Sequence, residues 1–152
     1  VVSLPKKNHE MLEKLAELGS DKASSEFGSA FYDGENDVDV GVDWFGNDTV
    51  EIVAKGDSVA FIEFGTGTVY TTPVHPVASI TGLVGRGEFG QGRGKYDYWY
   101  YDGDPGSGGI PIQIDGRSLV KTQGNPANMC LYYTMQDVKS NVRKVAKEVF
   151  GK

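Results

Sequence analysis

The sequence contains one cysteine and two histidines in 152 residues. A single cysteine excludes an intrachain disulfide and a structural zinc site built from cysteines. His9 and His75 lack the His-x-x-His or Glu-x-x-His spacing of a local metal site. No apolar run approaches the roughly 20 residues that a membrane-spanning helix needs. We therefore expect no metal, no cofactor and no membrane partner, in a protein that is made inside the cell or does not use disulfides.

Basic residues are also outnumbered, with 15 Lys and Arg against 21 Asp and Glu, for a formal net charge of −6. This balance argues against a surface that binds nucleic acid broadly, since such surfaces are basic. Hydrophobic residues make up 39% of the chain, which is enough to form a core. The length predicts a single domain over residues 1–152.

Glycine is the abundant residue type, and ten of the 21 glycines lie between Gly82 and Gly109. Residues 85–90 match G-x-G-x-x-G, but no good strand precedes them and no helix can follow directly. We therefore interpret residues 75–116 as a glycine-rich insertion, not as a dinucleotide site. We expect residues 82–94 to be mobile or extended in the isolated protein and ordered against a neighbour.

Helical spacing of apolar residues predicts a helix near each end of the chain. The first helix is expected to begin at Asn8 as its cap, and Gly19 predicts a stop or a kink in it. The last helix is expected to begin with Asn125 as N-cap and Pro126 at the first helical position. Its apolar stripe consists of Leu131, Met135, Val138, Val142, Val145 and Val149.

Alternating apolar and polar residues predict strands between these helices. Residues 38–44 and 50–54 are expected to pair as an antiparallel hairpin, and residues 59–64 to form a short helix or a third strand. An aromatic strand at 96–101 and a second hairpin, with strands at 110–114 and 118–122, are expected later in the chain. Pro111 indicates an edge strand. The fold class is α+β, with both helices packed on a small, curved, mainly antiparallel sheet that carries a glycine-rich loop and an aromatic hairpin.

The aromatic strand is the most conspicuous cluster of side chains. In a strand, Tyr96, Tyr98 and Tyr100 share one face, whereas Trp99 and Tyr101 share the other. Such a strand could stack on a glycan or a peptide, but aromatic residues on both faces favour an arm that packs on a neighbouring subunit.

No arrangement of residues in the sequence predicts catalysis. There is no G-x-S-x-G motif, and the acidic turns at Asp33 and Asp102 lack the glycine and glutamate positions of a calcium loop. Cys130 near the start of the last helix is either a thiol of lowered pKa or a buried small hydrophobe, and we favour the second. We expect a protein that is not an enzyme.

Residues 62–67 resemble the Ile-Glu-Phe-Gly-Thr-Gly signature of the gp-ten-like neck or tail-completion proteins of tailed phages. Two further blocks follow in order. Residues 87–90 with the aromatic residues 99–101, and residues 124–129 with a helix that closes at 146–150, look like the longer subgroup in phages and prophages of Gram-positive hosts. The extended glycine-rich segment departs from the shorter members of the family.

The resemblance implies a non-enzymatic structural protein of the virion, made in the bacterial cytoplasm. It implies a homo-oligomeric ring at the head–tail junction, with connector and tail proteins as neighbours and DNA that only passes through the channel. The residues that match the signature carry over as fold-defining or ring-contact positions: Glu63, Phe64, Gly65, Thr66 and Gly67. Glu63 could accept backbone hydrogen bonds, pair with a basic residue across a subunit contact, or lie exposed on a helix. The alternative function is a glycan- or peptide-binding module that uses the strand at 96–101.

Overall fold

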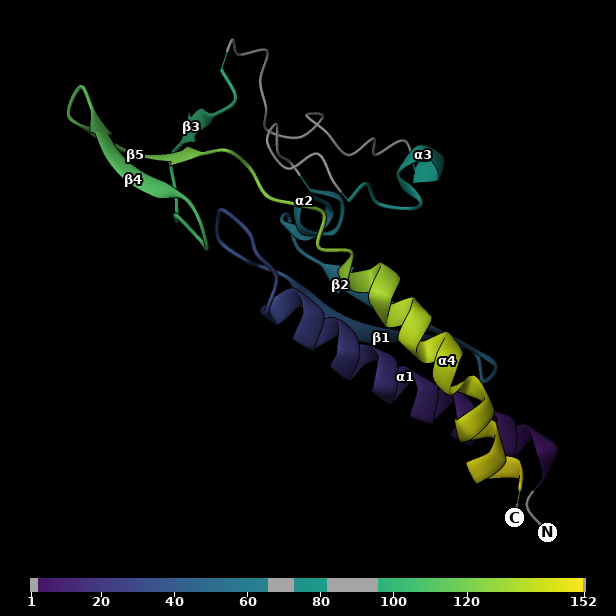
Figure 1. Cartoon of the computed structure of the whole chain (residues 1–152). Helices are drawn as coiled ribbons and strands as arrows, with labels where there is room; N and C mark the ends of the chain where they lie inside the picture. Colours follow the sequence, from purple (N-terminus) through teal and green to yellow (C-terminus); the bar gives the residue numbers. More distant parts are fainter. Residues whose placement is uncertain (1–2, 66–72, 82–95, 152) are drawn as a thin grey trace.

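The structure is a computed structural model that describes residues 3–65, 73–81 and 96–151. These residues form two long helices, two short ones and two small antiparallel sheets (Figure 1). The long helices, α1 (Leu4–Gly28) and α4 (Cys130–Phe150), lie side by side, and the beginning of α1 and the end of α4 are at the same end of the molecule (Figure 1). The expected α+β fold is confirmed, although its strands are divided between two sheets.

The contact between α1 and α4 is apolar. Leu15 of α1 forms a buried cluster with Val145 and Val149 of α4, and Met11 and Val142 pack against it. The predicted stripe is therefore buried in the C-terminal half of α4. In the N-terminal half, Met135 is 49% exposed. No helix in the described part of the chain is long and apolar enough to cross a membrane.

Helix α1 runs without interruption from Leu4 to Gly28, so the stop or kink predicted at Gly19 is wrong. The helix also begins before Asn8, which therefore does not cap it. A Cβ atom on Gly19 would lie 2.1 Å from Cδ1 of Ile52 and 3.0 Å from Cγ2 of Val138. Gly19 thus allows a close approach of strand and helix, and does not mark a helix end.

The predicted first hairpin is present as β1 (Asp39–Phe45) and β2 (Thr49–Lys55). Val42 lies opposite Ile52 in its register, so these two residues share a face. Helix α2 (Val59–Phe64) follows the hairpin. Of the two structures expected for this segment, the short helix is therefore the one observed. Val40 and Ala54 pack with Ile62 of α2 in a second core cluster around Phe27 and Cys130.

The second sheet contains β3 (Trp99–Tyr101), β4 (Ile110–Ile114) and β5 (Arg117–Thr122) in the order β3-β5-β4. The predicted hairpin β4–β5 is confirmed, and so is the edge position of the strand that carries Pro111. The aromatic strand is shorter than predicted. Within the predicted glycine-rich insertion at 75–116, Ala78–Thr81 form one helical turn, α3. The prediction for residues 82–94 lies outside the described residues.

The three-stranded sheet stands away from the two long helices (Figure 1). Hydrogen bonds join this sheet to the segment that follows α1. The Thr122 hydroxyl donates to Oδ2 of Asp33 at 2.5 Å, and the Ser107 N–H donates to the Tyr32 carbonyl at 2.7 Å. The structure therefore has a helical body and a smaller sheet that extends from it.

Candidate functional site

Helix α2 places one carboxylate in an otherwise apolar stretch. Its last turn carries Glu63, which is only 3% exposed. The first turn is held from outside the helix, because Asp37 accepts hydrogen bonds from the N–H groups of Asp57 at 2.7 Å and Ser58 at 2.9 Å. The Ser58 hydroxyl also donates to Asp37. These bonds stabilise the ionised form and lower the pKa of Asp37 to about 2.

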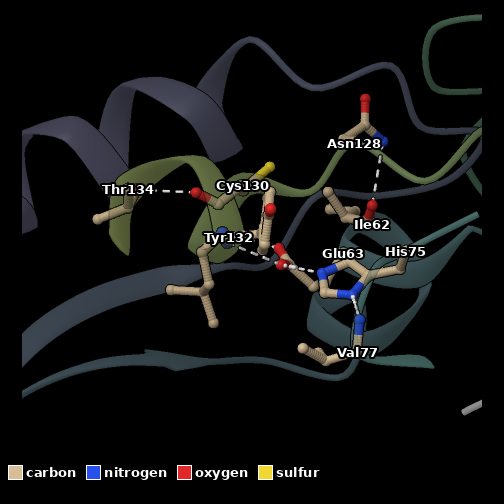
Figure 2. A network of polar contacts seen from close by, with 9 residues as sticks. Ile62, Glu63, His75, Val77, Asn128, Cys130, Tyr132 and Thr134 are labelled. Atoms are coloured by element: carbon tan, nitrogen blue, oxygen red, sulfur yellow. Dashed lines mark hydrogen bonds and ion pairs between the residues drawn. The ribbon is translucent and has the colours of Figure 1, made fainter. Parts of the chain in front are cut away.

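The Glu63 carboxylate caps α4. Its Oε2 accepts the Leu131 N–H at 2.8 Å, and its Oε1 accepts the Tyr132 N–H at 3.1 Å (Figure 2). Helix α4 has no side-chain cap of its own, since the N-cap residue is Met129 in a left-handed conformation with φ of 57°. A carboxylate at this position satisfies two N–H groups of the first turn and faces the positive end of the helix dipole.

His75 completes the arrangement, with an exposure of 4%. Its Nδ1 accepts the Val77 N–H at 3.2 Å, so Nε2 carries the hydrogen that is donated to Oε1 of Glu63 at 2.8 Å (Figure 2). A neutral imidazole with its hydrogen on Nε2 satisfies both contacts. The rings of Phe64 and Tyr132 enclose it, with centroids 4.4 Å and 5.7 Å from its own.

Residues 124–129 lie against the C-terminal end of α2. The Asn125 side-chain amide donates to the Phe61 carbonyl at 3.0 Å. The Asn128 amide donates to the Ile62 carbonyl at 3.1 Å, as Figure 2 shows. The prediction that Asn125 caps the last helix is therefore wrong. The helix begins four residues later than predicted, at Cys130, because these asparagines bond to α2 and not to the first turn of α4.

Gly65 allows the end of α2 and residues 124–129 to approach each other closely. Its φ is +79°, and a Cβ atom there would lie only 2.6 Å from the backbone nitrogen of Ala127. Both the backbone conformation and the close approach require glycine. We call Glu63, Gly65, His75, Asn125 and Asn128 the clasp. Thr66 and Gly67 of the predicted signature lie outside the described residues.

The clasp brings together two of the three blocks that carry the family resemblance, although about 60 residues separate them in sequence. Glu63 accepts backbone hydrogen bonds within its own chain and is not exposed, so the exposed-helix alternative for it is wrong. Both carboxylate oxygens of Glu63 accept hydrogen bonds from donors of the same chain. The contact between Glu63 and His75 therefore holds parts of one chain together.

Cys130 lies beside the clasp and is 1% exposed. Burial raises its pKa to about 12, and the nearby charges of Glu63 and Glu26 act in the same direction. The alternative of a thiol with a lowered pKa is therefore wrong, because desolvation and negative charge outweigh the helix start. Cys130 is therefore a buried small hydrophobe, which is the interpretation that the sequence favours.

The tyrosines form one continuous group on the outer side of the three-stranded sheet. The rings of Tyr96 and Tyr98 stack at 5.2 Å, and those of Tyr98 and Tyr100 meet edge to face at 5.6 Å. Lys121 places its ammonium 3.9 Å from the centre of the Tyr98 ring, a cation–π contact. Tyr96 is 61% exposed and Tyr100 is 42% exposed. One face of the predicted interface aromatics is thus available to a partner.

Trp99 and Tyr101 lie on the opposite face, as the strand alternation predicts. Together with Asp33 and Thr122 they line a pocket of about 360 Å³ between the sheet and the segment after α1. The Tyr101 hydroxyl donates to the Asp104 carbonyl at 2.6 Å. Burial raises the pKa of Tyr101 to about 12, and the nearby Asp33 charge contributes. The interface aromatics are therefore split between a covered face and an exposed one.

Sequence reasoning missed His75, Asn125 and Asn128 as parts of one network. A usable signal was present, since Glu63 is the only charged residue in Val59–Phe64 and a lone buried carboxylate requires partners. Within the described residues, no group of three or more His, Cys, Asp and Glu side chains is placed to hold a metal ion.

Comparison with known proteins identifies no family for this chain. No protein-family model, no curated protein and no solved structure matches the chain. The likeness to phage neck proteins therefore rests on the motif blocks in the sequence, and a functional role follows from it only as a proposal.

Proposed function

We propose that this chain is a non-enzymatic structural protein of a phage or prophage, which assembles into a ring at the head–tail junction. The observation that carries the proposal is the contact between the signature at Ile62 and Glu63 and the block at residues 124–129. Blocks that define one family are expected to meet in space if they are parts of one structural unit. Here they meet backbone to backbone, since the Asn128 N–H donates to the Ile62 carbonyl at 2.9 Å.

The chemistry of the clasp fits a structural role. A catalytic carboxylate or imidazole must offer an atom to a substrate. In this clasp, Glu63 bonds to two backbone N–H groups and to His75, and both ring nitrogens of His75 have partners in the chain. These side chains fix where α4 begins relative to α2.

The shape of the molecule fits assembly. A cyclic ring requires a heterologous contact, in which two different patches of the same chain meet. The three-stranded sheet extends from the helical body (Figure 1). It exposes tyrosines, the residue type that protein interfaces favour. The net charge of −6 suits a conduit that does not hold DNA tightly, because affinity for DNA comes from neutralising phosphates.

Deletion of the gene from its phage or prophage tests the role directly. We expect lysates with filled heads and separate tails, and tailed particles again when the wild-type gene is supplied in trans. Glu10→Gln, at an exposed position of α1, should restore particles as well as the wild type does. Normal infectious particles made without the protein would contradict the proposal.

A glycan- or peptide-binding module is the second candidate, and the exposed stack of Tyr96, Tyr98 and Tyr100 favours it. Tyr96→Ala combined with Tyr100→Ala removes the two most exposed rings without touching the covered face. Loss of glycan or peptide binding with assembly intact would favour the module. Loss of assembly would favour the ring.

A further inference from the structure

The pocket between the three-stranded sheet and the segment after α1 has aromatic walls. Its volume of about 360 Å³ is that of a site for a small ligand. Trp99 and Tyr101 line it from β3, Tyr32 lines it from the segment after α1, and Phe61 lines it from α2. All four side chains are half-buried. A molecule that enters the pocket therefore meets aromatic surface from three parts of the fold.

The same pocket carries negative charge. Four of its lining residues are acidic: Asp33, Glu35, Asp102 and Asp104. None of the lining residues in the described part of the chain is a lysine, an arginine or a histidine. None of the four carboxylates forms a salt bridge with another described residue. The described part of the chain therefore leaves this charge without a cation beside it.

Asp33 is half-buried, whereas the other three acids are exposed. Its Oδ2 accepts the Thr122 hydroxyl at 2.5 Å, but its Oδ1 is buried and has no hydrogen-bond partner among the described residues. A buried carboxylate oxygen without a donor is costly, and a nearby cation reduces that cost. Burial raises the pKa of both Tyr32 and Tyr101, and the charge of Asp33 adds to both shifts. The negative potential therefore acts at the aromatic walls.

Aromatic walls and uncompensated carboxylates together favour one class of ligand. The described His, Cys, Asp and Glu side chains do not converge in a group that could hold a metal ion. An organic cation suits the pocket better, because aromatic rings attract cations and also bury an alkyl chain. A primary ammonium group adds N–H donors for the carboxylates.

We propose that this pocket binds an alkylammonium group, and we call it the amine pocket. It is defined by Tyr32, Asp33, Trp99, Tyr101 and Asp102. The group belongs either to a small free amine or to a lysine side chain of a neighbouring chain. This inference goes beyond the proposed function and does not depend on it, because binding of a small amine is a property of the single chain.

A titration of the whole chain with n-butylammonium chloride tests the pocket. Backbone amide shifts in two-dimensional NMR spectra locate the site and give the dissociation constant. We expect saturable shifts at Gly103 and Gly124, which line the pocket. The neutral analogue n-butanol should bind about tenfold more weakly or worse, because it has the alkyl chain without the charge. Shifts that do not saturate, or equal affinities for the amine and the alcohol, would overturn the proposal.

Two double variants separate the pocket from the net charge of the chain. Glu35→Gln with Asp102→Asn removes two exposed carboxylates of the pocket. Asp39→Asn with Asp115→Asn is the matched control, because it removes the same charge from exposed positions outside the pocket. We expect the first pair to weaken n-butylammonium binding about tenfold and the control to weaken it less than about twofold. Equal weakening by both pairs would contradict a local site.

The aromatic wall has its own test. Trp99→Leu keeps an apolar side chain but removes the ring, and it should weaken n-butylammonium binding about fivefold. Trp44→Leu, at the other tryptophan, lies outside the pocket and should bind as the wild type does. Circular dichroism shows whether each variant is folded, and the charge variants carry the test if Trp99→Leu is not. Unchanged binding in a folded Trp99→Leu variant would contradict the aromatic wall and with it the proposal.

Assembly in the presence of the amine distinguishes the two sources of the ammonium group. If a lysine of a neighbouring chain fills the pocket, saturating n-butylammonium chloride should dissociate multimers that sodium chloride at equal ionic strength leaves intact. Multimers that stay intact while the pocket is saturated identify a free amine as the ligand. A chain that binds the amine but never assembles would support the pocket and contradict the ring. Rings formed by a chain that does not bind the amine would overturn the pocket and leave the ring.

Discussion

The Nε2–H of His75 donates to Oε1 of Glu63 at 2.8 Å, and both residues are buried. The same carboxylate accepts two N–H groups from the first turn of α4. Three segments that are distant in sequence, at residues 63, 75 and 130–132, are therefore fixed by one side chain. Removal of one partner leaves buried donors without an acceptor, which costs more than the loss of a surface contact.

Glu63→Gln should lower the free energy of unfolding by about 2 to 4 kcal/mol, because the amide replaces one acceptor oxygen with a donor among three existing donors. Glu10→Gln, at an exposed position of α1, should change it by less than about 0.5 kcal/mol. Chemical denaturation of both variants measures the difference. Equal stabilities of the two variants would show that Glu63 does not hold the clasp.

Gly65→Ala should destabilise the fold by at least about 2 kcal/mol, since it adds backbone strain and a contact with the backbone of Ala127. Gly116 in the β4–β5 turn is a matched control. Its φ is +78°, nearly that of Gly65, but its Cβ position is open. Gly116→Ala should therefore cost only the strain, about 1 kcal/mol. If thermal or chemical denaturation shows equal losses, the close approach at Gly65 contributes nothing.

The pKa of Asp37 gives stability a specific dependence on pH. The folded value is about 2 and the ordinary value is 3.8, so the folded state favours the ionised form. This stabilisation is complete above the ordinary pKa and is lost as pH falls from 3.8 toward about 2. The stability difference between wild type and Asp37→Asn should be constant near neutral pH and should shrink in that window. A constant difference down to pH 2 would contradict the assignment.

The Cys130 thiol should react with a disulfide reagent only when the protein unfolds. It is 1% exposed, and its pKa is raised to about 12, so thiolate is scarce at pH 8. The labelling rate should rise with denaturant in parallel with unfolding. The variant Ile110→Cys adds a thiol at an exposed position of β4, so it should label one thiol rapidly and the other slowly. Rapid labelling of the native wild-type protein would show that Cys130 is accessible.

Elements specified by neighbouring residues were predictable from the sequence. The alternation in 38–44 and 50–54 predicts the β1–β2 hairpin, and the strands predicted at 110–114 and 118–122 pair as the β4–β5 hairpin. Local spacing also identified the apolar stripe of α4. These patterns succeed because the period of a helix or strand is set within a few residues of chain.

Features that depend on distant partners were not predictable in the same way. Gly19 looks like a helix breaker, but glycine is required there because Ile52 and Val138 from other elements leave no room for a Cβ atom. Asn125 looks like a helix cap, but its amide bonds to Phe61 of α2. The clasp was visible only in part, through a lone carboxylate in an apolar stretch. The sequence left Glu63 open between backbone hydrogen bonds, a subunit contact and an exposed position on a helix, and it could not identify the partners of Glu63.

The mass of the assembled protein tests the central claim most directly. Native mass spectrometry and negative-stain imaging of the wild-type chain, alone and mixed with the phage connector and tail proteins that the proposed function names as its neighbours, measure whether it forms a ring. We predict closed rings of identical subunits in at least one of these preparations. A protein that remains monomeric in all of them and binds neither neighbour would contradict the account.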